Sequence, residues 1–147
     1  MANEIESEDE LAEIVRSMRT VAVVGAKAGR RDPDAPAYGI PKMLEARGVR
    51  IIPVNPTIPS ALGEPTRPNV AAVGERADVI NVFRRPAVIE ALADEILALP
   101  ADERPGVVWL QSGIRSDPAA AKLTAGGIRV VMDRCLGVYA ARYRRRG

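Results

Sequence analysis

The sequence of 147 residues contains no histidine, and this absence excludes several kinds of active site. Without histidine the chain can form neither a Ser–His–Asp triad nor a histidine-ligated zinc site, and it cannot carry phosphohistidine. The single cysteine, Cys135, cannot form an internal disulfide, which is typical of proteins from reducing compartments. The commonest nucleophile–base pairs are therefore excluded within this chain.

Aromatic residues, excess charge and long hydrophobic runs are also scarce. One Phe, one Trp and three Tyr are poor material for stacking nucleic-acid bases, and the net charge is only +2. We therefore predict that the protein does not bind nucleic acid. No run of about 18 apolar residues occurs, so the sequence predicts no membrane span. The acidic first ten residues lack the order of a signal peptide, and we expect a cytoplasmic protein.

Five short apolar runs indicate the strands of a buried sheet. They are rich in Val and Ile without polar alternation, which is typical of parallel strands covered on both faces. Helical patterns separate them, so the sequence predicts one α/β domain over residues 1–147, with its core from 14 to 143. The expected fold is a Rossmann-like, doubly wound parallel sheet of five strands with helices on both faces. With the strands numbered along the chain, right-handed crossovers suggest the order 3-2-1-4-5. The runs cover residues 20–24, 50–54, 79–83, 107–110 and 128–132.

Local signals mark where the helices begin and end. Ser7 and Glu10 form a capping-box pair that opens the first helix. A second helix is expected over residues 39–47, with Pro41 in its first turn and Gly48 as its stop. The remaining helices are expected from Pro86, over residues 118–125 and over residues 136–143.

The end of the first strand has the features of a phosphate-binding turn. Gly25 allows the backbone to approach a ligand closely. If a helix follows, its free N–H groups favour an anion such as a phosphate. Three cations, Lys27, Arg30 and Arg31, lie within a few residues of this turn. We therefore predict a phosphate-bearing ligand, and a nucleotide in particular.

Ligands of doubly wound sheets bind beyond the carboxyl ends of the strands, where this chain carries most of its unusual polar residues. The dinucleotide fingerprint needs an acid at the end of the second strand to bind ribose hydroxyls. This chain has Asn55 and Pro56 there, which suits NADP or coenzyme A better than NAD. A Walker A loop is also absent, because no Gly-Lys-Ser/Thr follows the turn.

Six segments in order resemble the CoA-binding-domain family of small bacterial proteins, which are similar to the nucleotide-binding half of the succinyl-CoA synthetase alpha subunit. The resemblance implies a Rossmann-like fold that binds coenzyme A or an acyl-CoA at the strand ends. Because the histidine and the further domain of the synthetase are missing, it implies binding without catalysis. The segments are 23–25, 38–44, 52–56, 78–86, 108–113 and 131–135.

By this resemblance, Gly25 and the following loop hold phosphate. Residues 54–56 lie beside the adenosine, and residues 83–85 line the opposite wall. Family members usually carry Ser or Thr where this chain has Lys27, so an ammonium–phosphate contact would replace a hydroxyl contact. The expected ligand-binding residues are Gly25, Ala26, Lys27, Arg30, Arg31, Val54, Asn55, Pro56, Phe83, Arg84, Arg85, Gln111 and Gly113.

Two other functions stay open on the sequence. One is an NAD(P)-dependent oxidoreductase, in which Lys27, Tyr38 or Asp133 would carry protons. A single domain of this size leaves little room for its substrate-binding region. The other is a ligand-responsive regulatory or interaction module that presents residues 56–68 or the basic C-terminus to a partner. The sequence identifies no protein partner and leaves a homodimer open.

Several of these residues also have a purely structural interpretation. Arg84 and Arg85 could be solvated charges before a helix. Trp109 is expected in the core, because it interrupts a buried strand. Cys135 is expected to be buried and inert rather than a nucleophile or a thiol that forms a mixed disulfide with coenzyme A. The segment 56–68, rich in Pro and Gly, is either a lid or a connector without a long element.

Overall fold

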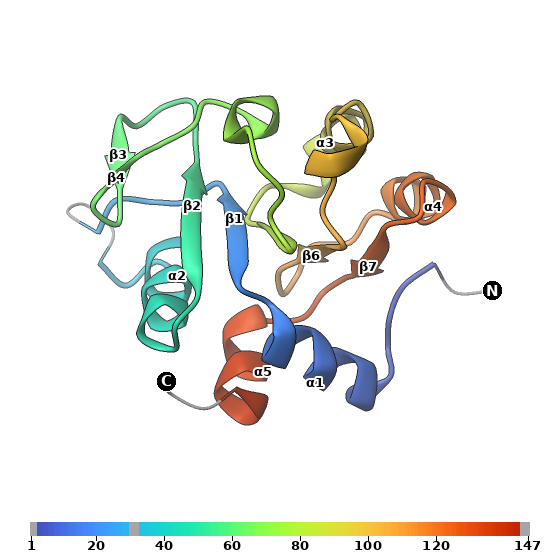
Figure 1. Cartoon of the computed structure of the whole chain (residues 1–147), viewed down its shortest axis with the longest axis horizontal. Helices are drawn as coiled ribbons and strands as arrows, with labels where there is room; N and C mark the ends of the chain where they lie inside the picture. The colour runs from blue at the N-terminus through green and yellow to red at the C-terminus, as the bar shows by residue number, and fades with distance from the viewer. Residues whose placement is uncertain (1–2, 30–32, 145–147) are drawn as a thin grey trace.

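The computed structural model describes residues 3–29 and 33–144 and contains one twisted sheet of five parallel strands (Figure 1). The predicted fold class and the five strands are confirmed. The order along the sheet is β2-β1-β5-β6-β7, with every neighbouring pair parallel. The strands are β1 (Thr20–Val24), β2 (Arg50–Val54), β5 (Val79–Val82), β6 (Val107–Leu110) and β7 (Arg129–Val131).

The predicted strand order was wrong. Numbered along the chain, the five strands lie in the order 2-1-3-4-5, so β5 pairs with β1 instead of lying outside β2. The chain returns from β2 to β5 across the face of the sheet opposite to α2 (Pro36–Ala46), by way of the 3-10 helix η1 (Val70–Val73). A right-handed crossover on that face leads back past β1. Both orders satisfy the handedness rule, and the hydrophobic pattern does not distinguish them.

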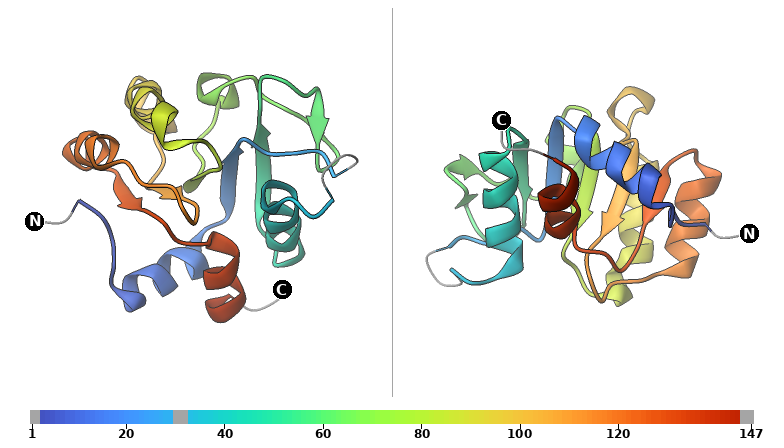
Figure 2. Two further views of the ribbon diagram at one scale, coloured as in Figure 1. Left: turned by 180° about the vertical axis from the view of Figure 1, so that it is seen from behind. Right: turned by 90° about the horizontal axis from the view of Figure 1, so that it is seen from below.

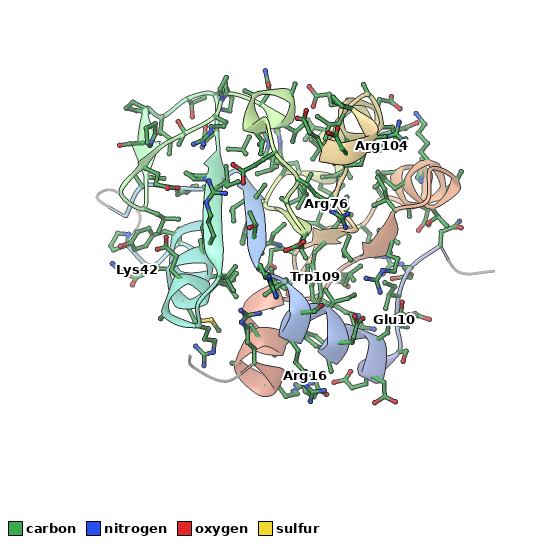
Figure 3. The ribbon with its side chains drawn as sticks, in the orientation of Figure 1. Glu10, Arg16, Lys42, Arg76, Arg104 and Trp109 are labelled. Atoms are coloured by element: carbon green, nitrogen blue, oxygen red, sulfur yellow. The ribbon has the colours of Figure 1, made fainter. Side chains whose placement is uncertain are left out.

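Helices cover both faces of the sheet and form two apolar cores. On one face α1 (Glu8–Ser17), α2 and α5 (Leu136–Tyr143) lie side by side (Figure 2). On the other face lie α3 (Ile89–Leu97), α4 (Asp117–Ala125) and η1. Side chains alternate between the two cores along each strand, as Val23 and Val24 do in β1. Trp109 is fully buried on the α1–α5 side, as predicted (Figure 3).

The helix α2 begins three residues earlier than predicted. Pro36 is its first residue and Pro41 lies inside it. A proline in that place has no N–H for the carbonyl four residues earlier. That carbonyl, on Ala37, instead accepts a hydrogen bond from the backbone N–H of Lys27 at 3.1 Å. The loop after β1 therefore makes an internal proline tolerable, because it satisfies the carbonyl that Pro41 leaves free.

The other helix signals agree with the structure more closely. The Ser7 hydroxyl accepts a hydrogen bond from the Glu10 N–H at 3.4 Å and caps α1. The predicted helix from Pro86 starts as one 3-10 turn, η2 (Pro86–Val88), and continues as α3. A further 3-10 turn, η3 (Ala101–Glu103), precedes β6. Among the described residues, no helix is long and apolar enough to cross a membrane.

The segment after β2 contains no long element, as predicted. It forms a small hairpin of β3 (Ser60–Ala61) and β4 (Glu64–Pro65) at the β2 end of the sheet (Figure 1). The two turn residues, Leu62 and Gly63, both have left-handed φ values of 54° and 77°, as the two-residue hairpin turn of type I′ requires. The chain then returns beside β2 through a single bridge between Val54 and Arg67.

Candidate functional site

The strand order changes direction at β1, and this creates a crevice at the carboxyl ends of β1 and β5. The loop after β1 leads to α2 on one face, and the loop after β5 leads to η2 and α3 on the other. Crevices at such switch points are where doubly wound sheets bind ligands. The crevice is held by two backbone hydrogen bonds: Phe83 N–H donates to the Val24 carbonyl at 2.9 Å, and Gly25 N–H donates to the Val54 carbonyl at 2.8 Å.

The backbone conformation and the packing of the protein require glycine at position 25, whether or not a ligand is bound. Gly25 has a φ of +91°, and a Cβ built on it would lie 2.6 Å from the carbonyl oxygen of Phe83. The sequence-based interpretation, that glycine here leaves space for a ligand, is therefore incomplete: the close neighbour is the backbone of Phe83, directly after β5. The expected helix does not start at this turn either, because α2 begins only at Pro36.

The loop of residues 25–29 is anchored from three sides. The Asn55 Nδ2 group donates to the Ala26 carbonyl at 2.9 Å, and Lys27 N–H donates to Ala37 as described. A Cβ on Gly29 would lie 2.4–2.7 Å from three ring atoms of Tyr38, so the Tyr38 ring packs directly on this glycine. The loop thus has a defined path over β1 and β2 without belonging to a helix.

A cavity of about 300 Å³ lies beside this crevice, on the α3 side of the sheet. We call it the α3 cavity. Most of its lining is apolar, and its polar groups are the side chains of Arg84, Asn69 and Glu95. Cavities with apolar walls and a few placed polar groups are typical small-molecule sites. The lining residues are Val24, Val54, Pro56, Pro68, Asn69, Val70, Arg84, Val88, Ala91, Leu92 and Glu95.

The half-buried Arg84 side chain crosses from the α3 cavity toward the Gly25 turn. Its Cδ would lie 3.3 Å from a Cβ on Gly25. Within residues 3–29 and 33–144, no hydrogen bond or ion pair engages the Arg84 guanidinium. A guanidinium presents five N–H donors in a fork that matches phosphate oxygens. Arg84 can therefore bind a phosphate at the mouth of the cavity without breaking any pair that the described residues form.

The structure brings some of the predicted residues together at this cavity. Val54, Pro56 and Arg84 line it, and Gly25 and Ala26 form the adjoining loop. Arg85 is exposed and precedes η2, and Lys27 is exposed on the loop. Phe83 is half-buried and packs against the core on the opposite face. Arg30 and Arg31 lie outside the described residues.

Asn55 and Gln111 are engaged within the protein rather than free to face a ligand. The Asn55 amide group binds Ala26, and its Oδ1 accepts from the N–H of Thr57 at 2.8 Å. The Gln111 Oε1 atom accepts from the Asn81 Nδ2 at 3.2 Å and from the Leu136 N–H at 2.9 Å. Gln111 thus joins β5 to the start of α5.

Gly113 and Cys135 also lie away from the α3 cavity. The Gly113 N–H donates to the Asp133 carboxylate at 2.6 Å, which ties together the loops after β6 and β7. Cys135 is half-buried at the start of α5, so the expectation of a buried thiol was wrong.

The sequence-based interpretation missed the outer wall of the α3 cavity. This wall comes from η1 and from one side of α3, at Val88, Ala91, Leu92 and Glu95. The sequence predicts the helix from Pro86, but none of its residues was placed at the ligand site. Asn69, which caps η1 through a 3.0 Å bond to the Ala72 N–H, was a further signal.

The reversed strand order and the cavity beside it define a doubly wound α/β domain of the kind that binds nucleotides at its strand ends. A family model of the CoA binding domain matches residues 19–141, and the chain belongs to this family. The family expected from the sequence motifs is thus confirmed. Membership indicates a coenzyme A-type ligand in general terms.

The similar proteins extend over almost the whole chain. The uncharacterized protein YneT of Bacillus subtilis (strain 168) is 34% identical over 132 residues, which are 90% of this chain and 93% of YneT. The structure of cell-free ID.343 from Thermus thermophilus is 37% identical, with a TM-score of 0.84 over 94% of this chain and 99% of that chain.

A third similarity shows the fold alone. The dinucleotide forming Acetyl-coenzyme A synthetase 1 of Ca. Korarchaeum cryptofilum, in complex with phosphate and ADP, is 20% identical with a TM-score of 0.60. The match covers 82% of this chain but 26% of the synthetase, so this fold occurs there as part of a larger protein.

Proposed function

We propose that the protein binds coenzyme A or an acyl-CoA at the carboxyl ends of β1, β2 and β5, and that it does so without catalysing a reaction by itself. The observation that carries this proposal is the α3 cavity, in which an apolar wall meets the guanidinium of Arg84, a group with no partner among residues 3–29 and 33–144. An adenosine phosphate has matching parts: a flat ring system that gains from burial and an anion that gains from a guanidinium.

The size of the cavity suggests which part of the ligand it receives. A volume of about 300 Å³ is at the lower end of ligand pockets and is too small for a whole coenzyme A. The adenosine would lie between Val54–Pro56 and Arg84, as the family resemblance implies. The pyrophosphate would then lie along residues 25–27, where Lys27 supplies a cation. The pantetheine arm would extend outward along the strand ends.

The end of β2 supports coenzyme A over NAD. An NAD site needs a carboxylate there to accept the ribose hydroxyls. Asn55 occupies the position, and its side chain is bonded to Ala26 and Thr57. A phosphorylated ribose is therefore not repelled by an acid at the end of this strand.

Calorimetric titration of the purified protein with coenzyme A, acetyl-CoA, NAD, NADP and ATP tests the proposal. We expect the two CoA compounds to bind most tightly and to raise the unfolding temperature most at equal concentration. Tighter binding of NAD than of coenzyme A would overturn it. Turnover of acetyl-CoA by the protein alone, measured as the release of free thiol, would contradict the proposal that the protein is not catalytic.

A further inference from the structure

A second cavity of about 550 Å³ lies on the other side of β2, between α2 and the β3–β4 hairpin. We call it the α2–hairpin cavity. Figure 3 shows Lys42 on the outer side of α2, toward the hairpin end of the molecule. The two cavities flank the turn that follows β2: Pro56 lines the α3 cavity, and Ser60 lines the second one. Its lining residues are Ala28, Gly29, Tyr38, Lys42, Glu45, Ser60, Ala61, Leu62 and Gly63.

Two residues of the loop after β1, Ala28 and Gly29, line this cavity. Within the described residues, no acceptor engages the backbone N–H groups of Ala28 and Gly29. The Tyr38 ring packs against Gly29 so closely that no side chain would fit there. The ring therefore fixes the position of these two amides, and successive free amides in a loop are suited to an anion.

The helix α2 also lines this cavity and supplies a positive charge at a defined place. The Lys42 Nζ atom donates a hydrogen bond to the Tyr38 hydroxyl at 2.9 Å, one helical turn away. This bond raises the pKa of Lys42, so the side chain stays an ammonium over the physiological range. The ammonium has further donors for a second acceptor.

An acid also faces the cavity and opposes an anion there. Partial burial raises the pKa of the Glu45 carboxyl, and the negative charge of Glu64 raises it further, while Lys42 lowers it. The carboxylate form is therefore less favoured in the folded protein than in the unfolded chain. A bound phosphate would disfavour it more, so Glu45 is expected to weaken phosphate binding.

We propose that the α2–hairpin cavity binds the 3′-phosphate of coenzyme A, through Lys42, the Tyr38 hydroxyl and the amides of Ala28 and Gly29. This inference rests on the proposed function, because it needs the adenosine in the α3 cavity. The ribose would then lie over the turn after β2, between the two cavities, and its 3′-phosphate would project toward Lys42. The site distinguishes coenzyme A from nucleotides that have no phosphate at this position.

Titrations with coenzyme A and 3′-dephospho-CoA, which differ only in this phosphate, test the inference. We expect the parent protein to prefer coenzyme A by about tenfold, the ratio that corresponds to about 1.4 kcal/mol. Lys42→Gln should bring this ratio close to one by weakening coenzyme A and leaving 3′-dephospho-CoA unchanged. Lys42→Arg should keep most of the preference, and Glu45→Gln should increase it.

A matched control is available on the far side of the sheet. Lys122 of α4 is also a paired surface lysine, bonded to Glu90 at 2.9 Å, and Lys122→Gln should leave the ratio unchanged. Thermal unfolding of each variant verifies that it is folded. Equal affinity of the parent protein for the two ligands would overturn the inference and leave the proposed function standing. A preference that survives Lys42→Gln would also overturn it, while failure to bind either ligand would refute both proposals.

Discussion

Replacement of Gly25 by alanine tests whether the crevice is built around the backbone of β5. Two costs add at this position. An L-residue at a φ of +91° costs about 1–2 kcal/mol. The added Cβ would lie 2.6 Å from the Phe83 carbonyl oxygen, and such overpacking costs about 1–3 kcal/mol. We therefore expect Gly25→Ala to lower the free energy of unfolding by about 2–5 kcal/mol.

Gly48 provides the control that separates the two costs. Its φ is +84°, and a Cβ there would meet nothing within 4 Å. Gly48→Ala should therefore show only the conformational cost of about 1–2 kcal/mol. Urea denaturation followed by circular dichroism gives both values, provided that the slope is the same for each variant. Equal losses for the two variants would refute the steric part of the reasoning.

This prediction changes how the ligand site should be tested. If Gly25 only allowed a close approach of the ligand, Gly25→Val would be a direct test of coenzyme A binding. The structure places the nearest obstacle in Phe83, so a bulky residue at Gly25 would disturb the fold even without a ligand. Lost binding in that variant would not locate the site. Substitution of Arg84 is the more specific test.

The remaining predictions concern ligand binding, helix capping and pH. Arg84→Ala should weaken coenzyme A binding about tenfold or more in calorimetry, because a charge-assisted contact with phosphate is lost. Arg85 is exposed, and Arg85→Ala should change the affinity little. Equal effects of the two substitutions would place the phosphate elsewhere. Arg144→Ala should lower the free energy of unfolding by about 2–3 kcal/mol, because its guanidinium donates to carbonyls at the end of α1, at 2.6 Å and 2.9 Å. Arg142→Ala breaks an exposed ion pair, which solvent screens, and should cost much less than Arg144→Ala; a similar loss in both urea titrations would contradict this. The pKa of the Glu45 carboxyl is higher in the folded protein than in the unfolded chain. Ionisation of this group therefore opposes folding increasingly as the pH rises above the pKa that Glu45 has in the unfolded chain. Glu45→Gln should therefore stabilise the protein at pH 7 and not at pH 3.5; a gain that is the same at both pH values would exclude this cause.

The strands could be predicted from the sequence because each buried strand is marked by its own run of apolar residues. Each run of Val and Ile without polar alternation became a strand within a residue of the expected bounds, as at Thr20–Val24 and Val107–Leu110. The start of α2 could not be predicted in the same way. Pro36 and Pro41 are both suitable first residues of a helix. The choice depends on the bond from Lys27 to the Ala37 carbonyl, which is a contact between separate segments.

The ligand site shows the same division between local and non-local information. Glycine and cations at a strand end could be recognised along the chain, but which strand ends lie together depends on the strand order. In the predicted order, the strand before Arg84 would lie beyond β2, separated from Gly25 by a whole strand. In the structure β5 pairs directly with β1, so the Arg84 side chain passes the Gly25 turn and enters the α3 cavity. The crossover through η1 that produces this order also forms the outer wall of the cavity at Asn69 and Val70. The segment 56–68, whose composition allowed either a lid or a connector, therefore leads directly into one wall of the site. The same crossover sets both the position of Arg84 and the shape of the α3 cavity.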